Sequence, residues 1–164
     1  MSLQNLQPCT AILWLTEPQS PDEKPRPLLR SWLTDTGLLT SRMRRLCADK
    51  FRLQVLEDDA TQTTDTLRRV MLCCGDLPCI YAETFLPAKT RAAHPWLRDL
   101  GSESLGEALQ SRSDVSRGSF EYALLGPAQL PVNANLSDES GLWARRSVFT
   151  VRHEPLTVTE IFLP

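Results

Sequence analysis

A single carboxylate near the C-terminus, Glu160, is the residue whose position most suggests chemistry. Residues 156–163 read as a strand, and along a strand successive side chains point to opposite faces. Glu160 therefore shares one face with Leu156, Val158 and Phe162. Because an unpaired carboxylate on an inward face is costly, we expect Glu160 to be paired, protonated or turned toward a polar cavity.

An arginine interrupts a second apolar pattern, in residues 67–74. Arg68 and Arg69 are adjacent, so their side chains point to opposite faces, and each shares its row with apolar residues. One of them must face inward, and periodicity does not say which. Two interpretations stay open. The inward arginine and Glu160 pair inside the sheet, or they lie apart in a pocket that offers a guanidinium to a ligand carboxylate and an acid to a ligand hydroxyl.

The elements that position these groups are mostly strands. Alternation predicts strands over residues 51–56, 67–74, 79–86, 119–125, 142–152 and 156–163, and helical spacing predicts short helices over 27–33, 40–46 and 102–109. Thr40 or Ser41 would cap the second helix, and residues 87–99 read as a connection. Turns at 75–78 and 153–155 make antiparallel hairpins. We therefore predict one α+β domain over residues 1–164, a single antiparallel β-sheet with a few short helices packed on it.

Composition narrows the classes of function. The net charge is −2 and the pI about 5.7, so we expect no nucleic-acid partner. No stretch reaches the roughly 18 to 20 apolar residues of a membrane span, and the apolar residues 11–15 lack the basic flank of a signal peptide. We expect a cytoplasmic monomer with no membrane insertion.

The cysteines favour the same compartment. The five cysteines lack the spacing of a disulfide framework, which predicts reduced thiols. They are Cys9, Cys47, Cys73, Cys74 and Cys79. Cys74 and Cys79 flank the predicted turn as candidate cross-strand neighbours, and Cys73 should point to the other face. Because no histidine lies within ten residues of this group, we expect buried structural thiols and no metal site.

Two separated hairpins resemble those of the chorismate lyase family of bacterial ubiquinone synthesis. Residues 67–73, Pro78 and residues 82–87 look like its central hairpin, and residues 141–147 with 156–164 look like its closing hairpin. Weaker matches are Leu105-Gly106 and residues 28–46. The likeness covers about residues 28–164 and leaves residues 1–27 largely unmatched.

The resemblance implies roles for individual residues. Arg68 would bind the ring carboxylate, the backbone N–H of Leu105 would contact a carboxylate oxygen, and Glu160 would hydrogen-bond the ring hydroxyl. Leu39 stands where the family can carry a pocket-lining methionine, a replacement that preserves volume. Glu83 departs from the family, whose members often have arginine there. Arg145 or Arg146 is a candidate replacement for that charge, and sheet-edge salt bridges are the alternative role for both.

The implied activity is a lyase that converts chorismate to 4-hydroxybenzoate and pyruvate, the first committed step of ubiquinone synthesis, without metal or cofactor. Either Glu160 assists proton movement, or hydrogen passes directly from the ring to the departing enolpyruvyl group. We favour the second mechanism, with Glu160 orienting the hydroxyl and Arg68 anchoring the ring, because no histidine or second carboxylate stands beside Glu160 in the strand pattern. The family also implies slow product release and a pocket closed by flaps, of which the Leu38-Leu39 loop is the first candidate.

The main rival is a non-catalytic domain of the same fold that binds small aromatic carboxylates. Such domains serve as effector-binding modules of bacterial transcription regulators, next to an N-terminal helix-turn-helix domain. The first 27 residues cannot supply that domain. An enzyme acting on a related cyclic carboxylate, or a structural protein, are further alternatives.

Overall fold

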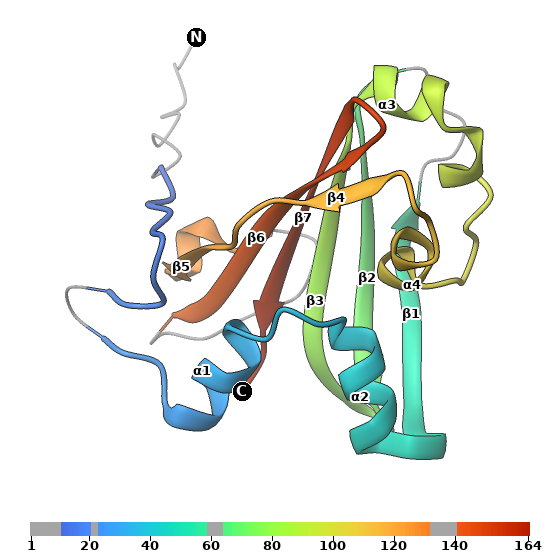
Figure 1. Ribbon diagram of the computed structural model, residues 1–164. Helices are drawn as coiled ribbons and strands as arrows, with labels where there is room; N and C mark the ends of the chain where they lie inside the picture. The colour runs from blue at the N-terminus through green and yellow to red at the C-terminus, as the bar shows by residue number, and fades with distance from the viewer. Residues whose placement is uncertain (1–10, 21–22, 59–63, 132–140) are drawn as a thin grey trace, which may run out of the picture.

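The computed structural model describes residues 11–20, 23–58, 64–131 and 141–164. In these ranges the chain forms one twisted antiparallel sheet with short helices around it (Figure 1), which confirms the predicted α+β class. The helices are α1 (Pro27–Leu33), α2 (Leu39–Cys47), α3 (Ala88–Ala93) and α4 (Leu105–Gln110). The strands are β1 (Phe51–Asp58), β2 (Thr66–Cys74), β3 (Leu77–Leu86), β4 (Val115–Arg117), β5 (Glu121–Leu125), β6 (Leu142–Val151) and β7 (Glu154–Phe162).

The sheet order is β1-β2-β3-β7-β6-β4, and β5 pairs with β6 as well. Every pair is antiparallel. The C-terminal strand β7 lies between β3 and β6, so the last strand of the chain joins the central hairpin to the closing one. The two regions that carry Arg68 and Glu160 are thereby neighbours in one sheet.

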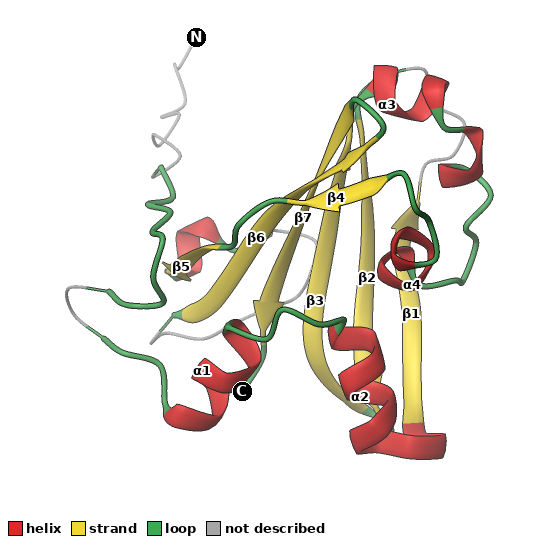
Figure 2. Cartoon of the chain, in the orientation of Figure 1, coloured by secondary structure: helices red, strands yellow, loops and turns green. Residues whose placement is uncertain are grey.

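Three helices lie on one face of the sheet, which we call the front face (Figure 2). Under α1 and α2, apolar side chains of the helices meet those of the strands, including Leu33, Leu39, Met43, Leu72 and Phe162. Under α4 a second cluster forms, including Leu105, Leu109, Phe149 and Leu156. The opposite face, the back face, has its own core around Met71, Tyr81 and Ile161, against which Trp14 packs. No helix in the described ranges has the length and apolar content that crossing a membrane requires.

The hairpin turns are tighter than predicted. Cys74 pairs with Leu77, so the turn consists of Gly75 and Asp76 alone and Leu77 already belongs to β3. Gly75 has a φ of +63°, a conformation that glycine adopts without steric cost. At the closing hairpin Val151 pairs with Glu154, so the predicted turn over residues 153–155 shifts toward the N-terminus.

Two helix predictions were wrong in detail. Helix α2 begins at Leu39 after Leu38 and has no side-chain cap, so neither Thr40 nor Ser41 caps it. The Thr40 hydroxyl instead lies 3.1 Å from the Ser104 hydroxyl, in a contact between α2 and α4. Residues 87–99 hold α3 and are not a plain connection, because Pro87 is compatible with a helix start and residues 88–93 include three alanines.

The cysteine prediction was wrong for two residues. Cys47 at the end of α2 and Cys74 at the end of β2 form a disulfide, with Cα atoms 5.4 Å apart, because chain folding brings together residues 27 positions apart. Cys74 lies opposite Leu77 and not opposite Cys79. Cys73 and Cys79 are free thiols, and Cys73 belongs to the back-face core, as predicted. Cys9 lies outside the described residues.

Candidate functional site

A small cavity of about 60 Å³ lies between the front face of the sheet and the start of α2 and α4. Strands β2, β3 and β7 provide its floor, and α2 and α4 cover it. All four site residues expected from the sequence line it, namely Leu39, Arg68, Leu105 and Glu160. Apolar side chains make up most of the remaining lining, as in sites that bind small organic molecules.

Arg68 is the inward arginine of the pair left undecided by periodicity. It is 2% exposed and lies on β2 between Asp58 of β1 and Thr84 of β3. Its Nη1 donates to the Asp58 carboxylate and, at 3.1 Å, to the Gly101 carbonyl, and its Nη2 donates to the Glu103 carbonyl at 2.9 Å. Its Nε is buried without a hydrogen-bond partner among the described residues. The guanidinium is therefore fixed in orientation while one donor remains unused.

Glu160 is paired, but not with Arg68. Its Oε2 accepts a hydrogen bond of 2.5 Å from Nε of Arg145, which lies directly opposite on β6. Strand β3 separates Arg68 from Glu160, so the two strands that carry them run roughly 10 Å apart. The interpretation in which the inward arginine pairs with Glu160 was therefore wrong, because Arg68 pairs with Asp58 and stands at a separate place in the cavity.

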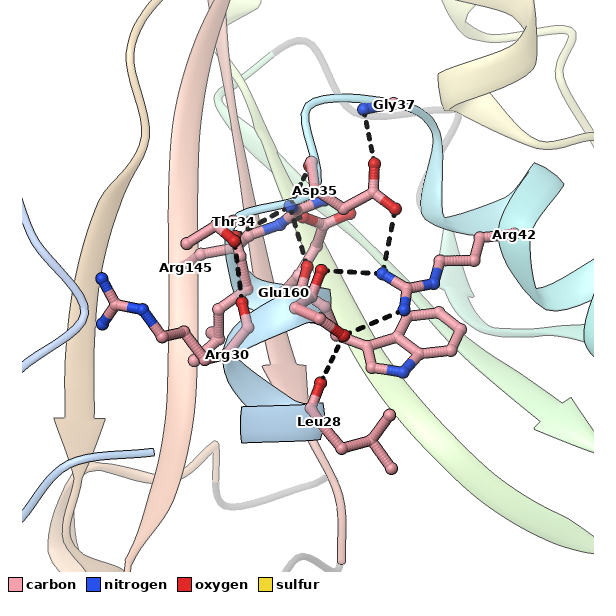
Figure 3. Close-up of polar contacts among 11 residues, drawn as sticks. Leu28, Arg30, Thr34, Asp35, Gly37, Arg42, Arg145 and Glu160 are labelled. Atoms are coloured by element: carbon pink, nitrogen blue, oxygen red, sulfur yellow. Dashed lines mark hydrogen bonds and ion pairs between the residues drawn. The ribbon is translucent and has the colours of Figure 1, made fainter. Parts of the chain in front are cut away.

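Arg145 connects Glu160 to the end of α1 (Figure 3). The side chain is fully buried, and its Nη1 donates to the carbonyls of Trp32, Leu33 and Asp35 at 3.3, 3.0 and 2.6 Å. These carbonyls lie at or just beyond the C-terminal end of α1, where the negative end of the helix dipole favours a cation. Arg145 therefore cannot turn into the cavity without breaking the end of α1.

The loop between α1 and α2 is held by the same network. The Asp35 carboxylate accepts a hydrogen bond from the backbone N–H of Gly37 at 2.8 Å, and it forms an ion pair with Arg42 at 3.0 Å (Figure 3). The guanidinium of Arg42 also stacks 3.8 Å from the Trp32 ring centre. The position of Leu38, which covers the cavity, is thus linked to the residues that hold Glu160.

Helix α4 supplies the other part of the cover. Ser104 is its N-cap, and its hydroxyl accepts from the N–H of Glu107 at 3.3 Å. Leu105 follows as the first helical residue, whose N–H has no intrahelical acceptor. Leu105 and Arg68 both line the cavity. The arrangement is compatible with the predicted contact between Leu105 and a carboxylate oxygen.

Arg117 is a lining residue that the sequence analysis missed. It lies on β4, which has three residues and is too short to show alternation. Its Nε donates to Ser147 Oγ at 2.9 Å, and its guanidinium lies 4.2 and 4.8 Å from the ring centres of Phe120 and Phe149. Burial lowers the pKa of Arg117, and the nearby Glu160 charge opposes that effect.

Glu83 and Arg146 lie on the back face, outside the cavity. Glu83 accepts from Arg69 at 2.9 Å and from the Tyr81 hydroxyl at 3.1 Å, and Arg146 pairs with Glu121 at 2.8 Å. Glu83 raises the pKa of Arg69, and burial raises that of Tyr81. The sheet register places these charged residues in one row across the back face, interrupted by one threonine, in the order Glu57, Arg69, Glu83, Thr159, Arg146 and Glu121. We call this row the back-face ladder.

Comparison with known proteins gives a consistent result. A family model described as chorismate lyase matches residues 9–164 and so begins before the motifs recognised from residue 28. The chain is 34% identical to a probable chorismate pyruvate-lyase of Dechloromonas aromatica, over 84% of this chain and 88% of the relative. It is 31% identical to one of Shewanella frigidimarina (94% and 89% covered) and 32% identical to one of Azoarcus sp. BH72 (96% and 93% covered).

Proposed function

The chain belongs to the chorismate lyase family, and from this premise we propose that its front-face cavity converts chorismate to 4-hydroxybenzoate and pyruvate. The resemblance seen in the two hairpins is thus confirmed. One observation best supports this use of the cavity. A buried guanidinium with one unused donor and a fixed carboxylate lie at two separate places in an otherwise mostly apolar lining. A ring that carries a carboxylate and a hydroxyl at opposite ends matches these two groups, the carboxylate at the guanidinium and the hydroxyl at the acid.

We propose that the ring carboxylate binds between Arg68 and the N–H of Leu105. Arg68 is held by Asp58 and by two backbone carbonyls, so little side-chain entropy remains to be lost when substrate binds. Its buried Nε lacks a partner in the described part of the chain, and an unmet buried donor favours binding of an acceptor. Leu39 lies across the cavity from the sheet and supplies apolar contact to the ring.

Glu160 is proposed to orient the ring hydroxyl. Arg145 donates to Oε2 of Glu160 and neutralises the charge of the carboxylate. Oε1 has no hydrogen bond in the described ranges and can accept from the substrate hydroxyl. A carboxylate held this firmly suits a positioning role. The bond between the ring and the ether oxygen then breaks. The hydrogen on the hydroxyl-bearing carbon moves to the enolpyruvyl methylene, so the ring becomes aromatic and the leaving group becomes pyruvate. Holding the reactive conformer is the contribution of the protein.

We further propose that the enzyme acts as a monomer in the cytoplasm. The lining residues that we assign to the ring come from one chain, so a second copy is not needed to complete them. Chorismate is a dianion, and charged molecules do not enter an apolar bilayer without help. An enzyme that uses it is therefore expected in the compartment where it is made. The cytoplasmic assignment rests on the charge of chorismate and no longer on reduced cysteines, because Cys47 and Cys74 form a disulfide.

Incubating the purified protein with chorismate and following 4-hydroxybenzoate by absorbance tests the proposal. We expect product and pyruvate in equal amounts. Binding of chorismate without product would instead indicate the non-catalytic aromatic-carboxylate domain, and absence of both would leave only the fold in common with the family.

A further inference from the structure

Chorismate carries a second carboxylate, on its enolpyruvyl group, and the roles given above leave that charge without a partner. Arg145 and Arg146 were the candidates named from the sequence. Arg146 lies on the back face and pairs with Glu121. Arg145 is fixed by Glu160 and by three carbonyls at the end of α1. Arg145 keeps one buried donor, Nη2, without a partner in the described ranges, but neither Arg145 nor Arg146 lines the cavity.

We propose that Arg117 binds the carboxylate of the enolpyruvyl group, an inference that rests on the proposed lyase function. Its Nε is used by Ser147, but its two terminal nitrogens make no hydrogen bond within the described residues. The nearest acid is Glu160, whose Oε2 is 3.9 Å from Nη2 and already accepts from Arg145. A guanidinium with two free terminal donors can bind a carboxylate in a bidentate manner.

The position of Arg117 follows from the connectivity of the substrate. The hydroxyl and the enolpyruvyl ether of chorismate are attached to neighbouring ring carbons. A group that binds the enolpyruvyl carboxylate must therefore lie beside the group that binds the hydroxyl. Arg117 satisfies this requirement, because it lies beside Glu160 and not beside Arg68.

The balance of charge around the cavity gives independent support. Among the described residues that we place at the site, Arg68 is matched by Asp58 and Arg145 by Glu160. Arg117 is the positive charge left over, and its side chain is 19% exposed. Burial lowers its pKa, which reflects the cost of keeping this cation partly desolvated. An anionic group bound at Arg117 would offset that cost.

Arg117 also marks the side of the cavity on which the leaving group would lie. Arg117, Leu38 and Phe149 line both the cavity and an adjoining surface hollow that includes Gly37 and Gln110. An enolpyruvyl carboxylate on Arg117 would point toward this hollow, and the ring would stay under Leu39 and Leu105. The rings of Phe120 and Phe149 hold the guanidinium in place by cation–π contact.

The test compares Arg117→Met with Arg146→Met, a matched control on the opposite face. For each we would measure kcat/KM for chorismate and the dissociation constant of 4-hydroxybenzoate, which has lost the enolpyruvyl group. Loss of a hydrogen bond to a charged group predicts a decrease in kcat/KM of roughly 10- to 150-fold for Arg117→Met. The affinity for 4-hydroxybenzoate should change by less than about threefold, and Arg146→Met should alter neither quantity by more than that.

Two outcomes would overturn the assignment. One is an unchanged kcat/KM in Arg117→Met. The other is an equal loss of affinity for 4-hydroxybenzoate, which would mean that Arg117 acts through Glu160. If Arg117→Met does not fold, as judged by urea unfolding, Arg117→Lys retains the charge without the bidentate geometry and should show the same pattern with a smaller decrease. If the wild-type protein releases no 4-hydroxybenzoate, the lyase function fails, independently of Arg117.

Discussion

Replacing Arg145 with methionine should destabilise the protein more than any replacement of a surface arginine. Arg145 is fully buried and pairs with Glu160, which is itself only 13% exposed. Removing one partner of a buried ion pair typically costs about 3–5 kcal/mol, because the other charge stays buried without compensation. Arg117, at 3.9 Å, offsets part of the Glu160 charge, so we expect a loss of about 3–4 kcal/mol in the free energy of unfolding.

Urea unfolding followed by tryptophan fluorescence measures this loss, and in a chain of this size it corresponds to a decrease in Tm of roughly 6–16 °C. The matched control is Arg146→Met on the same strand, whose more exposed pair with Glu121 should contribute about 0–1 kcal/mol. Adding Glu160→Gln to Arg145→Met should recover part of the loss, because no carboxylate then stays buried and unpaired. A loss below about 1 kcal/mol for Arg145→Met would refute the reasoning from the buried pair.

Three further predictions concern the cavity and the back face. Arg68→Ala should weaken chorismate binding by a larger factor than Glu160→Gln lowers turnover, because Arg68 anchors the ring whereas Glu160 only orients it; steady-state kinetics with the opposite order would remove both roles. Arg69→Glu should disrupt the back-face ladder and lower the free energy of unfolding by about 1–2 kcal/mol. Adding Glu83→Arg should restore at least half of the lost stability in thermal unfolding. If no stability is recovered, the two charges are not coupled. Cys73, which is 8% exposed and whose thiol pKa is raised by burial, should resist iodoacetamide in the folded protein and react in urea; rapid labelling at pH 7 without denaturant would contradict its placement.

Strand alternation was sufficient to find Glu160. The period of two placed it in an apolar row, and the structure puts Val158 of that row in the same cavity. Alternation could not choose between Arg68 and Arg69, because both rows of that strand are apolar on either side of the arginine. The choice depends on the register of β2 against its neighbours, which sets Arg68 beside Asp58 and Thr84. That register comes from the tight turn at Gly75 and from packing, neither of which the row pattern contains.

The contacts that hold the site were less accessible to sequence reasoning. The partner of Glu160 is Arg145, which is 15 residues away and faces it only because the β6–β7 turn is tight. Arg117 lies on a strand of three residues, a length at which no period can be recognised. The Cys47–Cys74 disulfide likewise depends on α2 packing against the end of β2. In each case the decisive contact joins elements that are distant along the chain.

The back-face ladder has a consequence for how the family diverges. The family resemblance implies arginine in many relatives at the position of Glu83, whose neighbour across the strand pair is Arg69. A single charge reversal at either position places like charges opposite each other, which destabilises a sheet. Because Glu57 also faces Arg69, lineages should exchange residues 57, 69 and 83 together, so that opposite signs are kept while the signs themselves alternate between branches. An alignment of the family would show this as covariation between positions 69 and 83, on the face of the sheet opposite the proposed site.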